Sequence, residues 1–349
     1  MIRAALIGAG EISLQHLACL HTLPGVTLAG VCDRSPALAE CAADRFGAGA
    51  WFVDHRAMLD AVRPDVVHVT TPVASHFQLA MDALEAGAHV IVEKPVCVAH
   101  DQVLALLRSA RDRRRVVIEN YNYLFNAPVQ RIGNLMKAGD LGEVVHVDVT
   151  LCLDLAHTHH LAGRAQASPD GSWHSEVICD FLPHLASLAH FFVGPHRAVR
   201  AQWSRPTSGP RLPLPEFRAL IEAELATAAL VFSARGQPDT FNVEVQGTKM
   251  RASAELYDRT LVVNRQGNDP GPIARLRSRL GAARALYTTA VGGFFTKLTD
   301  GRGAFDGLWS LLARTYAALE SGAEPPVSPR QIAEVNDLVA ALGAEESRF

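Results

Sequence analysis

The sequence predicts an α/β protein in which a doubly wound parallel sheet is followed by an α+β domain with a large, mainly antiparallel sheet. Along residues 1–123, short apolar runs alternate with segments of helical periodicity, whereas strands in residues 124–349 alternate apolar and polar residues. The length of 349 residues also exceeds the roughly 250 to 300 at which a single core stops growing. We therefore expect two domains, 1–123 and 124–349.

Short apolar runs in the first domain are predicted to be buried parallel strands. They are rich in valine and isoleucine and have no polar face, which is typical of strands covered on both sides. The runs are AALIG (4–8), LAGVCD (28–33), DVVHVTT (65–71), HVIVEK (89–94) and VVIEN (116–120). Segments of helical spacing separate them, so strand and helix follow each other as in a doubly wound sheet.

The second domain begins with a strand that alternates. In EVVHVDVTLCLDL (143–155) every second residue is apolar through most of its length, which predicts one buried face. Further strands are predicted at 198–204, 218–226, 228–235, 241–248 and 259–265, with closing helices at 307–322 and 328–344. The segment 274–295 has the composition of an amphipathic helix that could face a partner, which its spacing alone does not show.

Composition excludes several classes of protein. The formal net charge of -3 does not indicate binding to nucleic acid or to an anionic membrane. No apolar run approaches the ~18 residues of a membrane span, and the N-terminal residues do not resemble a signal peptide. The six cysteines show no C-x-x-C pairing, which suits free thiols in a reducing compartment. We therefore expect a cytoplasmic protein.

The first predicted strand ends in GAGEISLQH, a glycine turn that opens a helix. Because Gly8 and Gly10 lack a Cβ, the backbone can approach a pyrophosphate, which then meets the amides near Glu11 and Ile12. The alternative interpretation is a glycine turn in a fold of the same kind that binds nothing.

An acidic residue supports the dinucleotide interpretation. Asp33 follows Gly10 by 23 residues, at the end of the second predicted strand. Its carboxylate can accept hydrogen bonds from both ribose hydroxyls and would repel a 2′-phosphate, which favours NAD over NADP. The adjacent Arg34 weakens this preference, because a guanidinium can also bind that phosphate.

Two signatures lie in TTPVASHFQLAMDALEAGAHVIVEKPV, residues 70–96. The first is T-P-x-x-x-H and the second is E-K-P, formed by Thr71, Pro72, His76, Glu93, Lys94 and Pro95. Together with the glycine turn, they resemble the glucose-fructose oxidoreductase / inositol dehydrogenase / MocA (Gfo/Idh/MocA) family. The resemblance covers the first domain closely and continues with less specific motifs, such as YNYLFNAPVQRI and VEVQGTK, in the second.

The resemblance implies a dinucleotide-binding Rossmann domain and an NAD(P)-dependent oxidoreductase, with both signatures at the cofactor and Lys94 beside the nicotinamide. A residue just past a parallel strand points into the ligand crevice. Without the resemblance, a solvated lysine paired with Glu93 would be the simpler interpretation. We also predict a cis Lys94–Pro95 peptide bond.

The resemblance places the remaining catalytic residues in SEVICDFLPHLASLAHFF, residues 175–192. Asp180 and His184 are four residues apart, on one face of a predicted helix. The resemblance implies that His184 is the general base, Asp180 orients the substrate or the histidine, and Tyr123 contacts the substrate. A histidine pKa suits a base near neutral pH. The alternative is a His184 that caps or packs in the helix.

Two positions depart from the family's pattern. Val177, Ile178 and Cys179 stand where a glycine pair is usual, and Leu124 replaces the arginine of Y-N-Y-R-F. Either change can alter the substrate, and neither affects Lys94, Asp180 or His184.

Histidines cluster in DLAHTHHLAGR, residues 154–164. We expect Asp154 and His157 to contact the substrate, with a solvated loop as the second interpretation and a metal site involving His159 and His160 as the last. No metal is therefore predicted.

The predicted function is hydride transfer between nicotinamide and a secondary alcohol or ketone of a sugar, cyclitol, sugar acid or nucleotide sugar. The alternative is a non-catalytic, dinucleotide-sensing regulatory protein, and a third possibility is reduction of a non-sugar carbonyl. The resemblance also implies a homodimer or homotetramer that associates through the second domain's sheet.

Overall fold

The computed structural model describes residues 1–154, 180–204, 216–265, 271–300 and 305–344. The chain divides into two compact units, one made of residues 1–122 and 308–337 and the other of residues 123–307 and 338–349. The first unit thus includes a late segment, residues 308–337, which the sequence analysis assigned to the second domain.

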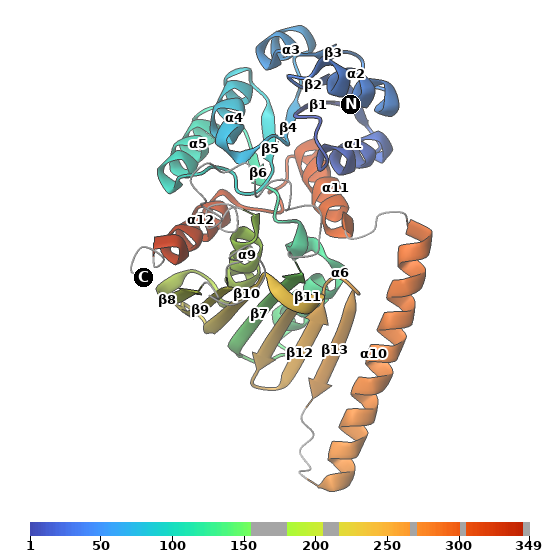
Figure 1. The fold of residues 1–349 in the computed structure, drawn as a ribbon, viewed down its shortest axis with the longest axis vertical. Helices are drawn as coiled ribbons and strands as arrows, with labels where there is room; N and C mark the ends of the chain where they lie inside the picture. Colours follow the sequence, from blue (N-terminus) through green and yellow to red (C-terminus); the bar gives the residue numbers. More distant parts are fainter. Residues whose placement is uncertain (155–179, 205–215, 266–270, 301–304, 345–349) are drawn as a thin grey trace. The chain divides into compact units, whose positions relative to one another are not determined.

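The first unit contains a six-stranded parallel sheet in the order β3-β2-β1-β4-β5-β6 (Figure 1). Its strands are β1 (Ile2–Ile7), β2 (Val26–Cys32), β3 (Trp51–Phe52), β4 (Val66–Val69), β5 (His89–Val92) and β6 (Val117–Glu119). Its helices are α1 (Ser13–Thr22), α2 (Pro36–Phe46), α3 (His55–Val62), η1 (Val73–Ser75), α4 (His76–Glu85) and α5 (His100–Asp112). The strand order reverses between β1 and β4, and a ligand crevice is expected at the carboxyl ends of these strands.

The predicted doubly wound sheet is confirmed, with one strand more than the sequence indicated. β3 has two residues, Trp51–Phe52, and α3 follows it at His55–Val62. A two-residue strand shows no periodicity, so local pattern does not reveal it.

The second unit contains a seven-stranded sheet in the order β13-β12-β11-β7-β10-β9-β8. The strands are β7 (Val144–Asp154), β8 (His196–Ser204), β9 (Glu216–Ala223), β10 (Thr227–Ser233), β11 (Arg235–Gly247), β12 (Met250–Glu255) and β13 (Thr260–Arg265). β7 and β10 run parallel, whereas the other neighbouring strands run antiparallel. The predicted mainly antiparallel sheet is therefore confirmed.

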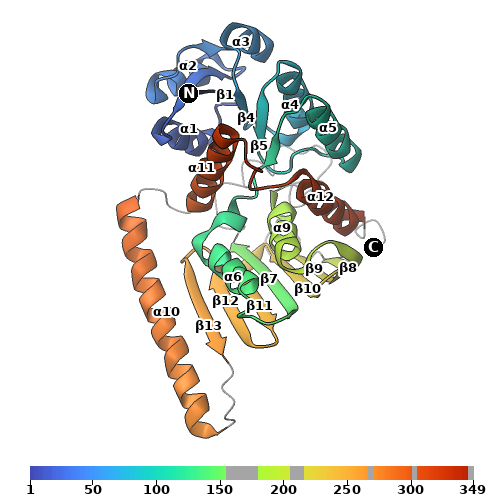
Figure 2. The same cartoon turned by 180° about the vertical axis from the view of Figure 1, so that it is seen from behind.

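Helices cover one face of this second sheet. α6 (Ala127–Lys137) and α9 (Leu182–Val193) lie on the same side of it, as Figure 2 shows. They cover Val147, Val149 and Leu151 of β7, which are at most 1% exposed. The predicted inward stripe does not extend to Val145, which is 53% exposed at the start of the strand.

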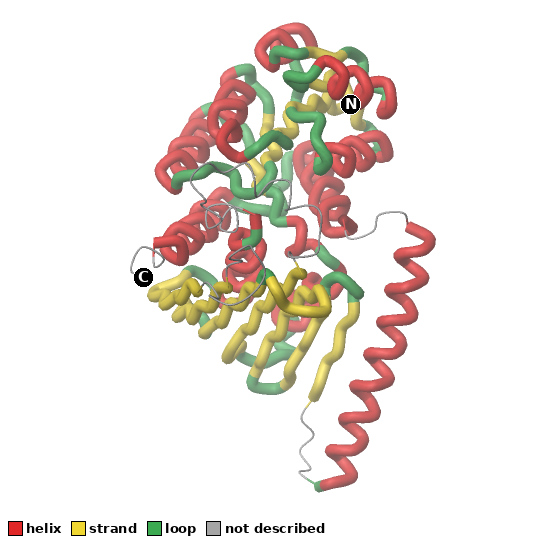
Figure 3. Tube along the Cα trace, in the orientation of Figure 1, coloured by secondary structure: helices red, strands yellow, loops and turns green. Residues whose placement is uncertain are grey.

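Three further helices and one short helix complete the description. They are η2 (Asn122–Phe125), α10 (Pro272–Asp300), α11 (Asp306–Ser321) and α12 (Pro329–Ala344), and Figure 3 shows α10 running beside β13. α11 and α12 confirm the predicted closing helices. Most of both belongs to the first unit, where two buried polar networks bind them to the parallel sheet.

One of these networks surrounds Glu119 at the end of β6. The Glu119 carboxylate is fully buried and accepts hydrogen bonds from the Tyr121 hydroxyl at 2.7 Å, the Asn336 amide at 2.6 Å and the Val96 backbone at 3.2 Å. Burial raises the pKa of Glu119 to about 7, although these hydrogen bonds and the charge of Lys94 act in the opposite direction. Asn336 of α12 is thereby fixed to a strand 217 residues earlier in the chain.

The raised pKa predicts how stability depends on pH. Because the folded pKa lies above the ordinary value of 4.5, the protonated form stabilises the fold. This contribution is complete below about pH 4.5 and is lost as the pH rises through about 7. We expect Glu119→Gln, which has no proton to lose, to flatten the fall in unfolding free energy between these pH values, as measured by urea denaturation. The exposed Glu40→Gln is the control, and an unchanged slope in Glu119→Gln would contradict the assignment.

Candidate functional site

The glycine turn after β1 is shaped by its contact with β4. Gly8 has a φ of 99°, and a Cβ there would lie 2.7 Å from Thr71 Cγ2 and 2.9 Å from the Thr70 carbonyl carbon. The Thr70 hydroxyl also donates to the Gly8 carbonyl at 2.6 Å. Gly8 is therefore required by the close approach of two loops at the carboxyl end of the sheet.

Gly10 has a different reason to be glycine. No heavy atom lies within 4 Å of the position that its Cβ would take, and its φ is not in the left-handed region. The protein itself leaves this space open, immediately before α1. A pyrophosphate could approach the backbone there and meet the helix N-terminus, so this observation fits a bound dinucleotide.

Asp33 is fixed beside the same turn. Its carboxylate accepts a hydrogen bond from the Ala9 backbone at 2.8 Å and another from the Ser35 backbone at 2.8 Å. Since a carboxylate has about four lone-pair directions, it can still accept hydrogen bonds from ribose hydroxyls. Arg34 is exposed next to it. Together with the open space at Gly10, these residues fit the adenosine and pyrophosphate parts of NAD.

His76 ties the two signature loops together. It is 1% exposed, and its Nδ1 lies 2.8 Å from the Pro95 carbonyl while its Nε2 lies 2.7 Å from the Thr71 carbonyl. Carbonyl oxygens only accept, so both contacts are hydrogen bonds when the ring carries both protons. His76 thus fixes the Thr71–Pro72 loop to the backbone that follows Lys94.

A chain of buried side chains ends on Glu93. His16 Nε2 lies 2.8 Å from Glu93 Oε1, His16 Nδ1 lies 2.8 Å from His68 Nδ1, and His68 Nε2 lies 2.9 Å from the Tyr316 hydroxyl. Both histidines are fully buried, and Tyr316 and Glu93 are 4% and 8% exposed. The chain therefore joins α1, β4, β5 and α11 within the first unit.

The geometry restricts where the protons lie. Only one proton fits between the two facing Nδ1 atoms. Burial and the neighbouring His16 lower the pKa of His68 well below 6.5, so His68 is neutral. Burial by itself would raise the pKa of Glu93, but the hydrogen bond from His16 and the charge of Lys94 lower it overall. Glu93 is therefore a carboxylate that accepts a hydrogen bond from His16 Nε2.

Lys94 follows β5 directly. The Lys94–Pro95 peptide bond is cis, which confirms the prediction, and the lysine is half-buried between Glu93 and Pro95. Two buried carboxyls lie near it, Glu93 and Glu119. In both, the positive charge of Lys94 opposes the rise in pKa that burial causes. Lys94 thus lies at the end of an interior strand, near two buried carboxyls on which its charge acts.

The second unit contributes a separate group of predicted site residues. The His184 ring packs edge-on against Tyr123, with centroids 4.7 Å apart, and Tyr123 also packs against Phe241 at 4.7 Å. Burial raises the pKa of Tyr123 to about 12, so its hydroxyl keeps its proton at neutral pH. The α9 helix begins at Leu182, which leaves Asp180 just before the N-cap, Phe181, and not inside the helix.

Asp154 ends β7 and is held by β11. Its backbone N–H donates to Asp239 at 2.7 Å, and its carboxylate accepts from the Gln237 amide. His157, His159 and His160 lie outside the described residues. Among the residues that are described, no group of three or more His, Cys, Asp or Glu side chains could hold a metal ion, and no helix is long and apolar enough to cross a membrane.

The structure brings some predicted residues together and leaves others as predictions. Gly8, Gly10, Asp33, Thr71 and the loop around Lys94 lie at the carboxyl ends of the parallel strands, and Tyr123 contacts His184. That Lys94 meets Asp180 and His184 around one substrate stays a prediction. Sequence reasoning gave no role to the chain formed by His16, His68 and Tyr316. A histidine inside an otherwise apolar strand, as in VVHV, was the signal available for it.

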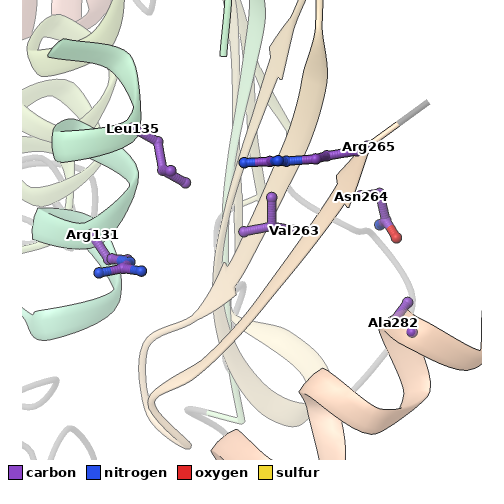
Figure 4. A pocket seen from close by; sticks show the side chains of 7 residues that line it. Arg131, Leu135, Val263, Asn264, Arg265 and Ala282 are labelled. Atoms are coloured by element: carbon purple, nitrogen blue, oxygen red, sulfur yellow. The ribbon is translucent and has the colours of Figure 1, made fainter. Parts of the chain in front are cut away.

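One pocket lies away from these residues, at the edge strand β13 (Figure 4). Arg131 and Leu135 project from α6 toward β13, where Val263 and Arg265 point back toward them. It is lined by Arg131, Leu135, Val263, Asn264, Arg265, Gly281 and Ala282. No predicted site residue lines it, and we assign it no role in catalysis.

Comparison with known proteins identifies the first unit. Residues 2–121 match the model of the oxidoreductase family with an NAD-binding Rossmann fold, GFO_IDH_MocA. D-glucoside 3-dehydrogenase of Escherichia coli is 33% identical over 144 residues, which are 41% of this chain and 41% of that protein. Levoglucosan dehydrogenase of Pseudarthrobacter phenanthrenivorans is 30% identical over 210 residues, which are 57% of this chain and 53% of that protein. The match therefore spans about half the length of these relatives.

A solved structure shows that the fold extends over the whole chain. The WlbA dehydrogenase from Bordetella pertussis, in complex with NADH and UDP-GlcNAcA, superposes with a TM-score of 0.78 over 99% of this chain and 96% of that one. At 19% identity this likeness concerns the fold.

The two glycines predict opposite effects of the same substitution. Gly8→Ala should lower the unfolding free energy by at least the ~1 to 3 kcal/mol of a strained φ, because the new Cβ also meets Thr71. Gly10→Ala should change stability by less than ~0.5 kcal/mol and weaken dinucleotide binding at least about tenfold, because its Cβ enters the open space. Thermal unfolding and NADH fluorescence titration measure the two effects. Unchanged NADH affinity in Gly10→Ala would show that the space is not the pyrophosphate site.

The buried chain predicts a large effect of removing one imidazole. His16→Phe leaves the Glu93 carboxylate without its donor, so we expect a loss of about 3 kcal/mol in unfolding free energy. Adding Glu93→Gln should recover part of this loss, because an amide is less costly to bury than a charge. His21→Phe, at an exposed position of the same helix, is the control, with an expected change below ~0.5 kcal/mol. An effect of His16→Phe as small as that of the control would contradict the assignment.

Proposed function

The chain belongs, through residues 2–121, to the Gfo/Idh/MocA oxidoreductase family with an NAD-binding Rossmann fold, and from this premise we propose that it is an NAD-dependent oxidoreductase. Its substrate is a secondary alcohol, or the corresponding ketone, of a sugar, cyclitol, sugar acid or nucleotide sugar. The observation that carries the proposal is the position of Lys94, directly after β5 and the buried Glu93, at the same carboxyl edge of the parallel sheet as a glycine turn open to a pyrophosphate.

NAD would be held by residues at the carboxyl ends of the parallel strands. The backbone at Gly10, Glu11 and Ile12 would face the pyrophosphate, and Asp33 the ribose. The loop of Thr71 and Pro72 would border the nicotinamide side, with His76 and Glu93 holding the loops from inside. The bound cofactor would supply a hydride acceptor or donor. Because Asp33 would repel a 2′-phosphate, we propose NAD over NADP, with Arg34 as the residue that could permit both.

The second unit would supply the acid-base chemistry. A ring nitrogen of His184 would take the proton of the substrate hydroxyl, and its contact with Tyr123 limits how the ring can turn. Lys94 would donate a hydrogen bond to the reacting oxygen, where an ammonium stabilises negative charge. Asp180, just before the same helix, would orient the substrate or His184. Tyr123, Asp154 and His157 would border the substrate.

The substrate class follows from the relatives. D-glucoside 3-dehydrogenase and levoglucosan dehydrogenase are named for carbohydrate substrates. The buried Leu124, which stands where the family often has an arginine, offers no charge to a substrate, so we propose a substrate contact different from theirs. A homo-oligomer associated through the open face of the seven-stranded sheet and a cytoplasmic location belong to the same proposal.

Nicotinamide absorbance tests the proposal directly. The purified protein is assayed with NAD or NADP and a panel of sugars, inositols, sugar acids and nucleotide sugars. Lys94→Met and His184→Ala should each lower turnover about 10²- to 10⁴-fold while leaving dinucleotide affinity unchanged, as expected for a positioned acid or base. Lys137→Met, an exposed lysine on α6, is the matched control and should retain full turnover.

The outcomes separate the two candidate functions. Full turnover in both variants would remove Lys94 and His184 from the mechanism. Tight NAD binding without turnover across the panel would favour the dinucleotide-sensing protein.

A further inference from the structure

The long helix α10 uses its small residues to pack against the sheet. Ala282, Ala285, Thr289 and Gly293 recur at helical spacing and are its less exposed positions. A Cβ at Gly293 would lie 2.7 Å from the Asp258 carbonyl oxygen, so the helix touches the turn before β13. Figures 1 and 3 show α10 running alongside this edge strand. The small residues allow a close approach but bury little apolar area.

Apart from Leu286 and Val291, the exposed large apolar residues of α10 lie on the opposite side. Ile273, Leu276, Leu280, Tyr287 and Phe294 are 66%, 59%, 61%, 71% and 58% exposed. With the exposed Ala283 and Ala290, they repeat at intervals of three and four residues. We call these seven residues the α10 seam. Its spacing is that of the a and d positions of a heptad repeated over about three heptads, which is the pattern of a helix that pairs with another helix.

We propose that the α10 seam pairs with the α10 seam of a second copy of this chain, in antiparallel orientation. When the two helices are aligned about residue 285, large residues meet small ones near the centre of the pair and large ones further out. Leu280 lies opposite Ala290 of the partner subunit, and Tyr287 lies opposite Ala283 of the partner subunit. Leu276 lies opposite Phe294 of the partner subunit. A seam that complements itself in this way forms a closed, two-fold interface.

Charge supports the antiparallel orientation. Arg277, Arg279 and Arg284 are exposed in the first half of α10, whereas residues 285–294 carry no charged side chain. A parallel pair would place both sets of arginines side by side, and like charges at such positions repel. In the antiparallel pair the arginines of each helix mostly border the uncharged half of the other, and the two helix dipoles also oppose each other.

The size of the surface agrees with a second copy. The seam spans 22 residues, so at ~1.5 Å per residue it is about 32 Å long. Two such seams together offer on the order of 1,000 Å² of apolar surface, which reaches the lower limit of a specific interface. A membrane surface would require a wider apolar face than one heptad stripe. The contact is independent of the enzymatic proposal.

Sedimentation at micromolar concentration tests the interface. The double variant Leu280→Lys/Tyr287→Lys should halve the native mass, to a dimer if the wild type is a tetramer and to a monomer if it is a dimer. Both side chains are exposed in the single chain, so circular dichroism should show that each subunit keeps its fold. Leu225→Lys, at a 67% exposed leucine between β9 and β10, is the matched control and should keep the native mass.

Several results would overturn the proposal. It fails if the double variant keeps the wild-type mass. It also fails if the wild type is a monomer, and binding of that monomer to anionic phosphatidylserine vesicles would then assign the seam to a membrane surface.

Cysteine cross-linking tests the orientation. Chains with Leu280→Cys are mixed with chains carrying Ala290→Cys and a longer tag, and are then oxidised. We expect the mixed disulfide to predominate, because residues 280 and 290 are opposite in the antiparallel register. The wild type, with its exposed Cys41, gives the background. Predominant self-linking of Leu280→Cys would overturn the antiparallel orientation.

Discussion

The hydrogen bond between His16 and Glu93 is the interaction on which the proposed site depends. A carboxylate at the end of a central strand, 8% exposed, would cost several kcal/mol if it had no donor. His16 supplies the donor from α1, and Asn120 supplies a second one from the end of β6. Because the glycine turn begins α1 and Lys94 follows Glu93, the same contact connects the proposed pyrophosphate site to the proposed catalytic lysine.

Several charged and hydrogen-bonding side chains of the first unit lie near the Glu93 carboxylate. Glu93 is ionised beside the positive charge of Lys94, and we assign the one proton between the two facing Nδ1 atoms to His68. In that arrangement each donor has an acceptor, since the Tyr316 hydroxyl donates to His68, His68 donates to His16, and His16 donates to Glu93. Glu119 is also close enough to Lys94 for its charge to act on it, and burial raises the pKa of Glu119 to about 7, so one carboxyl near the lysine is ionised and the other titrates near neutrality. The lysine is therefore held by rigid strand ends and a buried network, as a positioned catalytic group requires.

Much of this arrangement could be predicted from the sequence, because it depends on patterns among residues that are close together in the chain. Uniform apolar runs indicated the parallel strands, alternation indicated the antiparallel sheet, and the glycine turn, Asp33 and E-K-P indicated the cofactor side. β3 was too short to show a pattern, and β12, with Arg251, Ser253 and Glu255 on one face, was not recognised. The contact between His68 and Tyr316 joins residues 248 apart, and no local pattern pairs residues at such a separation. The same holds for the direction of the α10 seam, which depends on which face of the helix β13 covers.

The measurement that tests the account most directly is the protonation of the two facing histidines. Nitrogen-15 NMR of histidine-labelled protein at neutral pH, assigned with His16→Phe and His68→Phe, distinguishes neutral tautomers from imidazolium. We expect His68 to be protonated at Nδ1, donating to His16 Nδ1, and His16 to donate from Nε2 to Glu93. A proton on His16 Nδ1, or a His68 protonated at Nε2, would reverse the direction of the hydrogen-bond chain and contradict this account.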